Sequence, residues 1–366
     1  MRNDHKASSS RYAVAVLAGA VLLLAESNAV GDAALNALKL CATVIIPSLF
    51  PYMVIAGMIV SLGAADLIGK WTRPFCRRFF RLPGESASAI LLGALCGFPV
   101  GAQTASSLFE QKRLTADEAE RLIAIANNTG PAFVIEVVGA HCWGDRGFGL
   151  FVYVSQIVTA FLIGTLYARF SHKTENSKKA DPQKRARYVP KKDLLTTLAE
   201  NVSKAALSVL IVSGFVVFFA VVLSLLSRIL SKIGADSLLP VVGVLLEFTS
   251  GTALSAKLGG TLGAFLTGLA VGWSGISVFA QSKVFTSPLS LRLTPAAVSK
   301  AIQGVLTGGA AALYYRLFCT RAASVSTCIP ITDTPEMLVL GEVVLLILFC
   351  LVPALYEKKE RRTRPS

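Results

Sequence analysis

Two groups of polar residues lie inside apolar stretches of this sequence, where their side chains could recognise a small polar molecule. The first is the run Asn127–Pro131, which reads Asn-Asn-Thr-Gly-Pro, and the second centres on Glu247, which directly follows the apolar run Val241–Leu246. Amides and hydroxyls can donate and accept hydrogen bonds, whereas a carboxylate only accepts them or binds a cation. An ionisable group at membrane depth costs about 2.5–3.5 kcal/mol on insertion scales and is by default a candidate for function.

We therefore expect Asn127, Asn128 and Thr129 to contact a solute. We expect Glu247 to bind a coupling cation, relay a proton or accept hydrogen bonds from the solute. Two structural alternatives stay open at this stage. The Asn-Asn-Thr run could be a polar kink sealed by neighbouring helices, and Glu247 could form a structural ion pair with Lys257 or Lys283.

Two further apolar stretches, 87–110 and 260–285, are interrupted near their midpoints by Gly97–Gly101 and Gly272–Ser277. In hydrocarbon, a broken helix survives only where protein or a water-filled cavity surrounds it. A pair of such breaks at corresponding places in two halves points to the substrate site of a transporter. The exposed half-helix N-termini favour an anionic or carbonyl-bearing solute. Alternatively, the glycines simply allow close helix packing.

These patterns define a candidate site for a small solute and for a coupling ion. The candidate solute-binding residues are Gly97, Pro99, Gly101, Gln103, Asn127, Asn128, Thr129, Thr249, Ser250, Ser274, Ser277 and Gln281, and the candidate for the coupling ion or proton is Glu247.

The two halves of the chain share a short pattern. Ala102-Gln103 is followed by Arg113-Leu114-Thr115, and Ala280-Gln281 is followed by Arg292-Leu293-Thr294. Each pattern follows a glycine-rich break and opens the next helix, with a predicted capping box of Thr115 and Glu118 in one and a predicted Thr294 N-cap before Pro295 in the other. We interpret the halves as a diverged internal repeat.

The composition predicts an all-α protein that spans a membrane several times. Of 366 residues, 53% are apolar and 16% are charged, whereas about a quarter of an average soluble domain is charged. Several apolar runs approach the roughly 20 residues that cross a bilayer. The predicted spans lie near 12–30, 46–66, 118–140, 148–170, 203–230, 238–256, 295–317 and 336–356.

The net charge of +14 is confined to short gaps between apolar runs, chiefly Lys70–Arg81, Arg169–Lys192 and Lys358–Arg364. Such placement is typical of cytoplasmic loops and tails, and no basic segment is long enough to be a nucleic-acid-binding domain. We predict an N-terminal span or signal-anchor (1–32), a first transmembrane repeat (33–170), a basic cytoplasmic linker (171–197), a second repeat (198–356) and a basic tail (357–366). The tail favours a cytoplasmic C-terminus, whereas inverted repeats would place it outside.

Enzyme and metal motifs are absent from the sequence. The seven cysteines form no CxxC pair, although Cys319 and Cys328 share a polar segment in which they could pair. Gly272–Gly275 matches the GxSG pattern of intramembrane serine proteases, but all three histidines precede the serine and none lies deep in a predicted span. We therefore expect no enzymatic activity, cofactor, metal or nucleic-acid partner, and leave open whether the chain forms a homo-oligomer.

Three segments of the first half carry a family resemblance: Leu82–Ala102, Leu114–Ala119 and Asn127–Pro131. They resemble the gate or nucleoside-recognition domain, and more closely the YlbJ-type (SpoVV) sporulation integral membrane proteins. The second half adds Leu246–Gly251 and Gly275–Gln281, which are similar to the same family.

This resemblance implies a fold similar to concentrative nucleoside transporters, with two repeats that each contain a broken, re-entrant hairpin. It also implies the transport of dipicolinic acid, a pyridine dicarboxylate, across a bacterial cell membrane or a membrane that surrounds the forespore. A membrane scaffold for sporulation and a nucleoside-type transporter are the alternatives. The expected partners are a small-molecule solute, a coupling cation or proton and membrane lipid.

Overall fold

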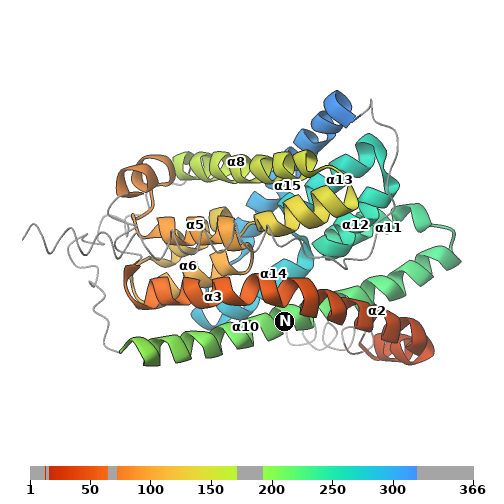
Figure 1. Ribbon diagram of the computed structural model, residues 1–366, viewed down its shortest axis with the longest axis horizontal. Helices are drawn as coiled ribbons and strands as arrows, with labels where there is room; N and C mark the ends of the chain where they lie inside the picture. Colours follow the sequence, from red (N-terminus) through yellow and green to blue (C-terminus); the bar gives the residue numbers. More distant parts are fainter. Residues whose placement is uncertain (1–12, 14–15, 65–71, 171–192, 320–366) are drawn as a thin grey trace, which may run out of the picture.

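The computed structural model describes residue 13 and the ranges 16–64, 72–170 and 193–319, in which the regular structure is entirely helical (Figure 1). The all-α prediction is therefore confirmed for this part of the chain. Most of the basic linker, the last predicted span at 336–356, the tail from residue 357 and the Cys319–Cys328 pairing lie outside the described residues.

The first described helices form a bent pair in the region of the span predicted at 12–30. Val16–Ala25 and α2 (Ser27–Leu40) meet at 93°. Glu26 lies at the bend, where its carboxylate pairs with Arg228 at 2.6 Å and Lys232 at 3.5 Å. These ion pairs join the bend to the end of α10 (Leu194–Lys232).

The rest of the first half contains two interrupted helix pairs and one long helix. Its elements after α2 are η1 (Cys41–Ile45), α3 (Ile46–Ser61), η2 (Cys76–Phe80), α5 (Ser86–Cys96), α6 (Val100–Glu110), α7 (Ala116–Ala126), η3 (Phe133–Cys142) and α8 (Arg146–Phe170). Helices α5 and α6 pack against each other as a hairpin. The capping box of Thr115 and Glu118 opens α7 as predicted.

The second half has the same kinds of elements in the same order. They are α10 (Leu194–Lys232), η4 (Asp236–Leu238), α11 (Leu239–Leu246), α12 (Phe248–Leu258), α13 (Gly260–Trp273), α14 (Gly275–Thr286), η5 (Ser287–Leu289), α15 (Thr294–Tyr314) and η6 (Tyr315–Cys319). Helices α11 and α12 form a second hairpin. The predicted Thr294 N-cap is displaced, because Thr294 is already helical and the cap position is Leu293.

Each half thus contains a hairpin, a broken helix and an unbroken helix: α5/α6, α7/η3 and α8, then α11/α12, α13/α14 and α15. Two of the predicted spans, 118–140 and 238–256, are interrupted in the structure: the first breaks at 127–130, beside the Gly-Pro pair, and the second breaks at Glu247. This order pairs the break at Gly97 with the break at Glu247. The Arg-Leu-Thr pattern instead aligns Gly97–Gly101 with Gly272–Ser277, one helix pair farther along. That the repeats are inverted stays a prediction.

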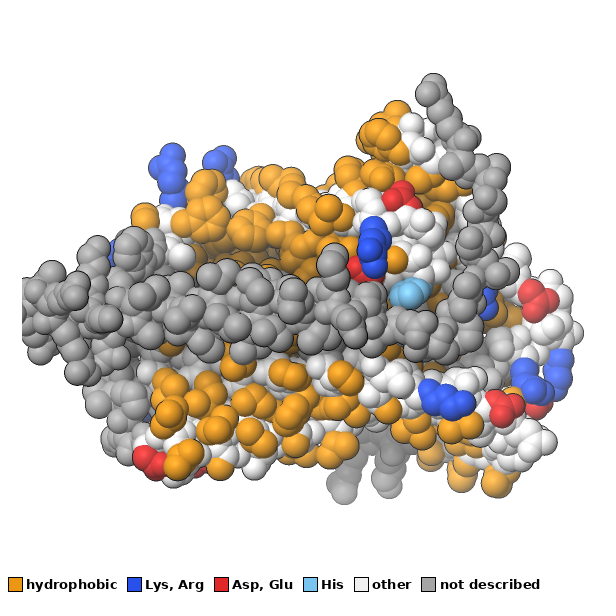
Figure 2. All heavy atoms as spheres, viewed as in Figure 1, with side chains coloured by type: hydrophobic (Ala, Val, Ile, Leu, Met, Phe, Trp, Pro, Cys, Tyr) orange, Lys and Arg blue, Asp and Glu red, His pale blue; other side chains and the backbone are white. Residues whose placement is uncertain are grey.

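The described helices include three that are long and apolar enough to cross a membrane, or four if the bent pair counts as one span. The three are α8, α10 and the nearly continuous Gly260–Leu289. On the face drawn in Figure 2, hydrophobic side chains cover much of the described surface above and below the grey band, and most of the charged side chains lie toward the two ends. In Figure 1, α3 and α10 lie side by side along one edge and α8 along the opposite edge, with α5, α6 and α14 between them.

We predict that Gly93→Ala destabilises the protein by about 1–3 kcal/mol, as overpacking of a tight core does. A Cβ atom at Gly93 would lie 1.8 Å from the carbonyl oxygen of Ala126, so α5 would be forced away from the end of α7. Thermal unfolding in detergent measures the change. Gly214→Ala in α10 is the matched control, because no atom lies within 4 Å of its added Cβ, and it should be neutral or slightly stabilising. Equal stability of the two variants would contradict the packing argument.

Candidate functional site

Within the described chain, four helix breaks meet in the middle of the protein. The hairpin tip at Gly97 lies against the α7/η3 break, since a Cβ at Gly97 would come within 2.6 Å of the Gly130 nitrogen. The other tip lies against the α13/α14 break, with Gly275 placed so that its Cβ would be 3.0 Å from the Leu246 oxygen. Both glycines have positive φ, +81° and +80°, a region that glycine adopts without strain. Each hairpin tip is therefore seated on a broken helix of its own half.

Contacts between the halves complete this arrangement. The rings of Phe98 and Phe248, one from each hairpin tip, meet edge to face with centroids 4.7 Å apart, and Phe133 lies 4.9 Å from Phe248. The hydroxyl of Thr129 in the α7/η3 break donates a 3.1 Å hydrogen bond to the carbonyl of Val271 near the end of α13. The breaks of the two halves therefore form one connected centre.

This convergence brings four helix N-termini to one place, because α6, η3, α12 and α14 all begin directly after a break. A helix N-terminus carries unpaired N–H groups and a partial positive charge of about half an elementary charge. The centre therefore favours anionic or carbonyl groups over cations.

Asn128 and Thr129 act largely in sealing the broken backbone, which supports the structural alternative for these two residues. The side chain of Gln156 in α8 accepts from the Thr129 N–H at 3.3 Å and donates to the Thr129 carbonyl at 2.7 Å. Asn128 donates to the Ile125 carbonyl at 2.8 Å and accepts from Gln303 at 3.0 Å. Gln156 and Gln303 were not predicted from the sequence, because a glutamine in a helical run gives no signal of what it faces.

Asn127 differs from its two neighbours in having unused hydrogen-bonding capacity. Its Nδ2 donates to Ser282 Oγ at 3.1 Å. In the described part of the protein, three nearby side-chain atoms are buried without a hydrogen-bond partner: Asn127 Oδ1, Ser274 Oγ and Gln281 Oε1. Leaving such an atom unpaired typically costs about 1–3 kcal/mol. These three predicted residues are therefore the best candidates to contact a solute or water.

A closed pocket, too tight in this structure to hold a water molecule, lies beside two of these residues, Asn127 and Ser274. It is lined by Ile123, Asn127, Ser274, Val278, Phe279, Ser282, Leu293, Ala296 and Lys300. Asn127 and Ser274 come from breaks in different halves, so the pocket lies where the two broken helices meet. The structure thus brings together the predicted Asn127 and Ser274 and adds Ser282 and Lys300.

Lys300 is the most unexpected member of the site. It is 2% exposed, and its Nζ donates to Asn128 Oδ1 and Gln303 Oε1, both at 2.8 Å. Both partners are neutral amide oxygens, and no carboxylate of the described residues lies within ion-pair distance of this ammonium. The sequence held a signal for it, since Lys300 lies inside the predicted span 295–317 and lysine in a span is costly.

Glu247 is 1% exposed and caps α12. Its carboxylate accepts from the Thr249 N–H at 3.0 Å, the Ser250 N–H at 2.8 Å and the Thr249 hydroxyl. The described residues show no ion pair between Glu247 and Lys257 or Lys283, so the alternative considered from the sequence is not observed. Thr249 and Ser250 are thus partners of Glu247. A carboxylate at a helix N-terminus is electrostatically favourable, and its role with a coupling ion stays a prediction.

The other predicted residues contact neighbouring groups of the protein. Gly101 packs against the end of α7, where an added Cβ would lie 2.2 Å from the Ala126 oxygen. Gln103 donates to Ser208 in α10 at 3.2 Å, and Ser277 accepts from Gln281 at 3.2 Å. Pro99 precedes α6 in the first hairpin tip. Gly101 therefore fits the packing alternative, and the direct solute contact predicted for the others is untested.

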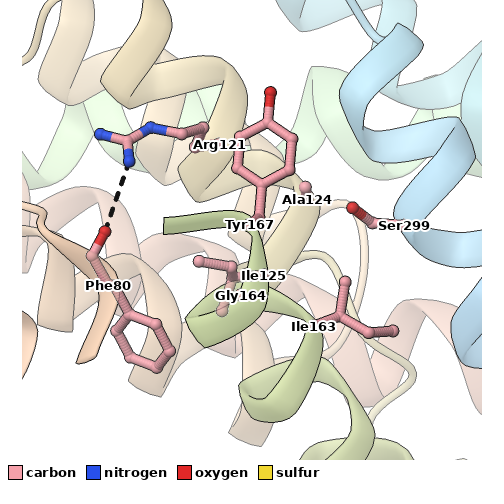
Figure 3. Close-up of a pocket in the computed structure, with 8 residues that line it drawn as sticks. All are labelled: Phe80, Arg121, Ala124, Ile125, Ile163, Gly164, Tyr167 and Ser299. Atoms are coloured by element: carbon pink, nitrogen blue, oxygen red, sulfur yellow. Dashed lines mark hydrogen bonds between the residues drawn. The ribbon is translucent and has the colours of Figure 1, made fainter. Parts of the chain in front are cut away.

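A separate pocket lies near η2, between α7, α8 and α15 (Figure 3). Its lining is mostly apolar, and its charged residue, Arg121, is already engaged. Arg121 pairs with Asp117 at 3.1 Å and donates to the Phe80 carbonyl at 3.5 Å. This pocket therefore offers a solute fewer unpaired polar groups than the pocket at the helix breaks.

We predict that Gln156→Leu lowers the free energy of unfolding by about 2–6 kcal/mol, since it leaves both Thr129 backbone groups buried and unpaired, at about 1–3 kcal/mol each. Gln103→Leu is the control, because it removes a glutamine whose bond is to a side chain instead of a broken backbone. Thermal unfolding in detergent compares the two. A Gln156→Leu variant as stable as Gln103→Leu would contradict the assigned role.

The chain is similar in sequence to a known protein family and to a known membrane protein. Residues 42–165 match the family model described as "Gate: Nucleoside recognition". The chain is 25% identical over 313 residues to the sporulation integral membrane protein YlbJ of Bacillus subtilis (strain 168), which covers 77% of each chain. No solved structure matches the chain. The similarity to an integral membrane protein and the long apolar helices both support a membrane location. The chain is thus similar to the YlbJ-type sporulation integral membrane proteins and carries the Gate, or nucleoside-recognition, region in its first half.

Proposed function

We propose that this protein is a membrane transporter of a small anionic heterocyclic solute, with dipicolinic acid during spore formation as the leading candidate. The observation that carries the proposal is the convergence of four helix breaks from both halves of the described chain. Two of these breaks supply Asn127 and Ser274, which line a closed pocket and carry buried, unpaired polar atoms. Interrupted backbone at membrane depth is costly unless protein or a water-filled cavity surrounds it. Transporters use this arrangement to bind solutes at a repeat interface.

The charge of the pocket supports an anion. Four helix N-termini begin at the breaks, Lys300 lines the pocket, and the carboxylate of Glu247 is already occupied by three hydrogen bonds within α12. A pyridine dicarboxylate offers two carboxylates for positive groups and a ring for Phe279, the aromatic residue of the pocket lining. The YlbJ relative is named a sporulation integral membrane protein, which agrees with a role in spore formation. On this proposal the protein is not an enzyme.

Two other functions have specific support. The description of the matched family model, nucleoside recognition, favours a nucleoside-type solute. The tight packing of the helix breaks favours a scaffold that assembles sporulation proteins without moving a solute. An inverted relation between the repeats would support transport, because it allows one site to open to either side of the membrane.

The uptake of dipicolinate by proteoliposomes tests the proposal directly. We expect protein-containing vesicles to take up radiolabelled dipicolinate faster than protein-free vesicles and to leave uridine and adenosine outside. Uptake of nucleosides instead would favour the second solute class. Folded protein that moves neither solute, under several ion gradients, would favour the scaffold.

A second prediction concerns Glu247. Glu247→Gln keeps an oxygen that can accept from the N–H groups of α12 but removes the negative charge, so we expect a folded variant that loses at least tenfold in ion-driven or proton-driven uptake. Thr252→Val, which removes a hydroxyl that bonds within the same helix, is the control and should keep normal uptake. Normal gradient-driven uptake by Glu247→Gln would remove its coupling role.

A further inference from the structure

We propose that Lys300 is the residue that selects an anionic solute: a carboxylate in the pocket replaces Asn128 and Gln303 as the partner of its ammonium group. This inference rests on the proposed transport function and specifies the chemistry by which the same pocket chooses its solute. It is carried by three independent features, which are the neutral surroundings of Lys300, its place in the pocket lining and its connection to the α7/η3 break.

The first feature is a missing counter-charge. Helix α15 packs against α7, α8 and α13. Neither α8 nor α13 contains an aspartate or glutamate. The acidic residues of α7 are engaged elsewhere: Asp117 pairs with Arg121 at 3.1 Å, Glu118 caps the helix at Thr115, and Glu120 pairs with Arg292 at 3.1 Å.

Glu247 is also committed, since its carboxylate caps α12. A buried ammonium that contacts only neutral oxygens is poorly compensated. An anion that contacts this ammonium therefore gains more binding free energy than a neutral solute of the same shape.

The second feature is that the Lys300 side chain lies in the pocket lining. Lys300 lines the same pocket as Asn127, Ser274 and Ser282. The Ser274 hydroxyl has no partner among the described residues and can donate to a carboxylate. Asn127 offers either amide atom to the solute, because Ser282 can donate to it or accept from it. The pocket thus combines one cation with neutral donors, as recognition of a carboxylated ring requires.

The third feature links binding to the broken helix. Lys300 and Gln303 both donate to Asn128 Oδ1, and Gln303 also donates to the carbonyl of Gln156, whose side chain holds Thr129. A carboxylate that takes the ammonium removes one of the two donors from Asn128. Binding of an anion therefore changes the hydrogen bonds of Asn128 at the α7/η3 break, whereas a neutral solute leaves these hydrogen bonds intact.

A pair of ligands that differ in charge tests the proposal by calorimetry on the purified full-length protein in detergent. Dipicolinate carries two carboxylates, and pyridine-2,6-dimethanol replaces them with neutral hydroxymethyl groups. We expect the protein to bind dipicolinate at least tenfold more tightly. Lys300→Gln should lower dipicolinate affinity at least tenfold and change affinity for the neutral analogue less than twofold, and Lys300→Arg should keep part of the preference.

Lys283→Gln, at an exposed lysine on α14, is the matched control and should bind both ligands as the unaltered protein does. A Lys300→Gln variant that still prefers dipicolinate tenfold would overturn the role of Lys300 while leaving transport intact. If the Lys300 variants do not fold, the test is the affinity of the unaltered protein for the two ligands. Equal affinity for dipicolinate and pyridine-2,6-dimethanol also overturns the proposal. Binding of neither ligand, together with no uptake by vesicles, would instead count against the proposed function itself.

Discussion

The structure depends on satisfying backbone groups where helices are interrupted. Each break frees N–H and C=O groups that cannot be left unpaired in hydrocarbon. At the α7/η3 break, the amide of Gln156 meets both groups of Thr129. At the α11/α12 tip, the Glu247 carboxylate meets the first N–H groups of α12. Gln156 belongs to α8, so the α7/η3 break is sealed only when that helix is in place, whereas Glu247 caps its own helix.

The same requirement explains the small residues around the breaks. Gly97 and Gly275 seat the hairpin tips on the broken helices, and Gly93 and Gly101 bring the first hairpin onto the end of α7. Close backbone approach excludes lipid and leaves room for only a narrow pocket. The glycines and the hydrogen-bonding amides therefore serve one purpose, which is to keep polar backbone away from hydrocarbon while leaving a few polar atoms unpaired inside.

The sequence predicted the all-α architecture and the breaks near Gly97 and Ser274, because glycine and proline act locally and an apolar run reveals any interruption. It also placed Asn127 and Glu247 inside apolar stretches, and both are buried. Three features escaped it because they depend on tertiary contacts. The Arg-Leu-Thr pattern aligned the first hairpin with the broken helix α13/α14, whereas the order of elements aligns it with the second hairpin, α11/α12. A few identical residues carry less information about a repeat than the order of its helices. The cap at Glu247 required knowing that a helix begins at Phe248. The partners of Lys300 lie in α15 itself and in α7/η3, and no spacing in the sequence connects Lys300 to Asn128.

The balance of charge at the centre limits which solutes are plausible. Helix N-termini and Lys300 contribute positive charge, and the buried carboxylate at Glu247 is directed at the backbone of its own helix. A neutral nucleoside would leave that positive charge uncompensated, although its hydroxyls could pair with Asn127 and Ser274. A dicarboxylate compensates it and still uses the same hydrogen-bonding atoms. The nucleoside-recognition architecture and an anionic solute are therefore compatible: the broken helices provide the pocket, and the identity of the residue at position 300 decides the charge of what enters it.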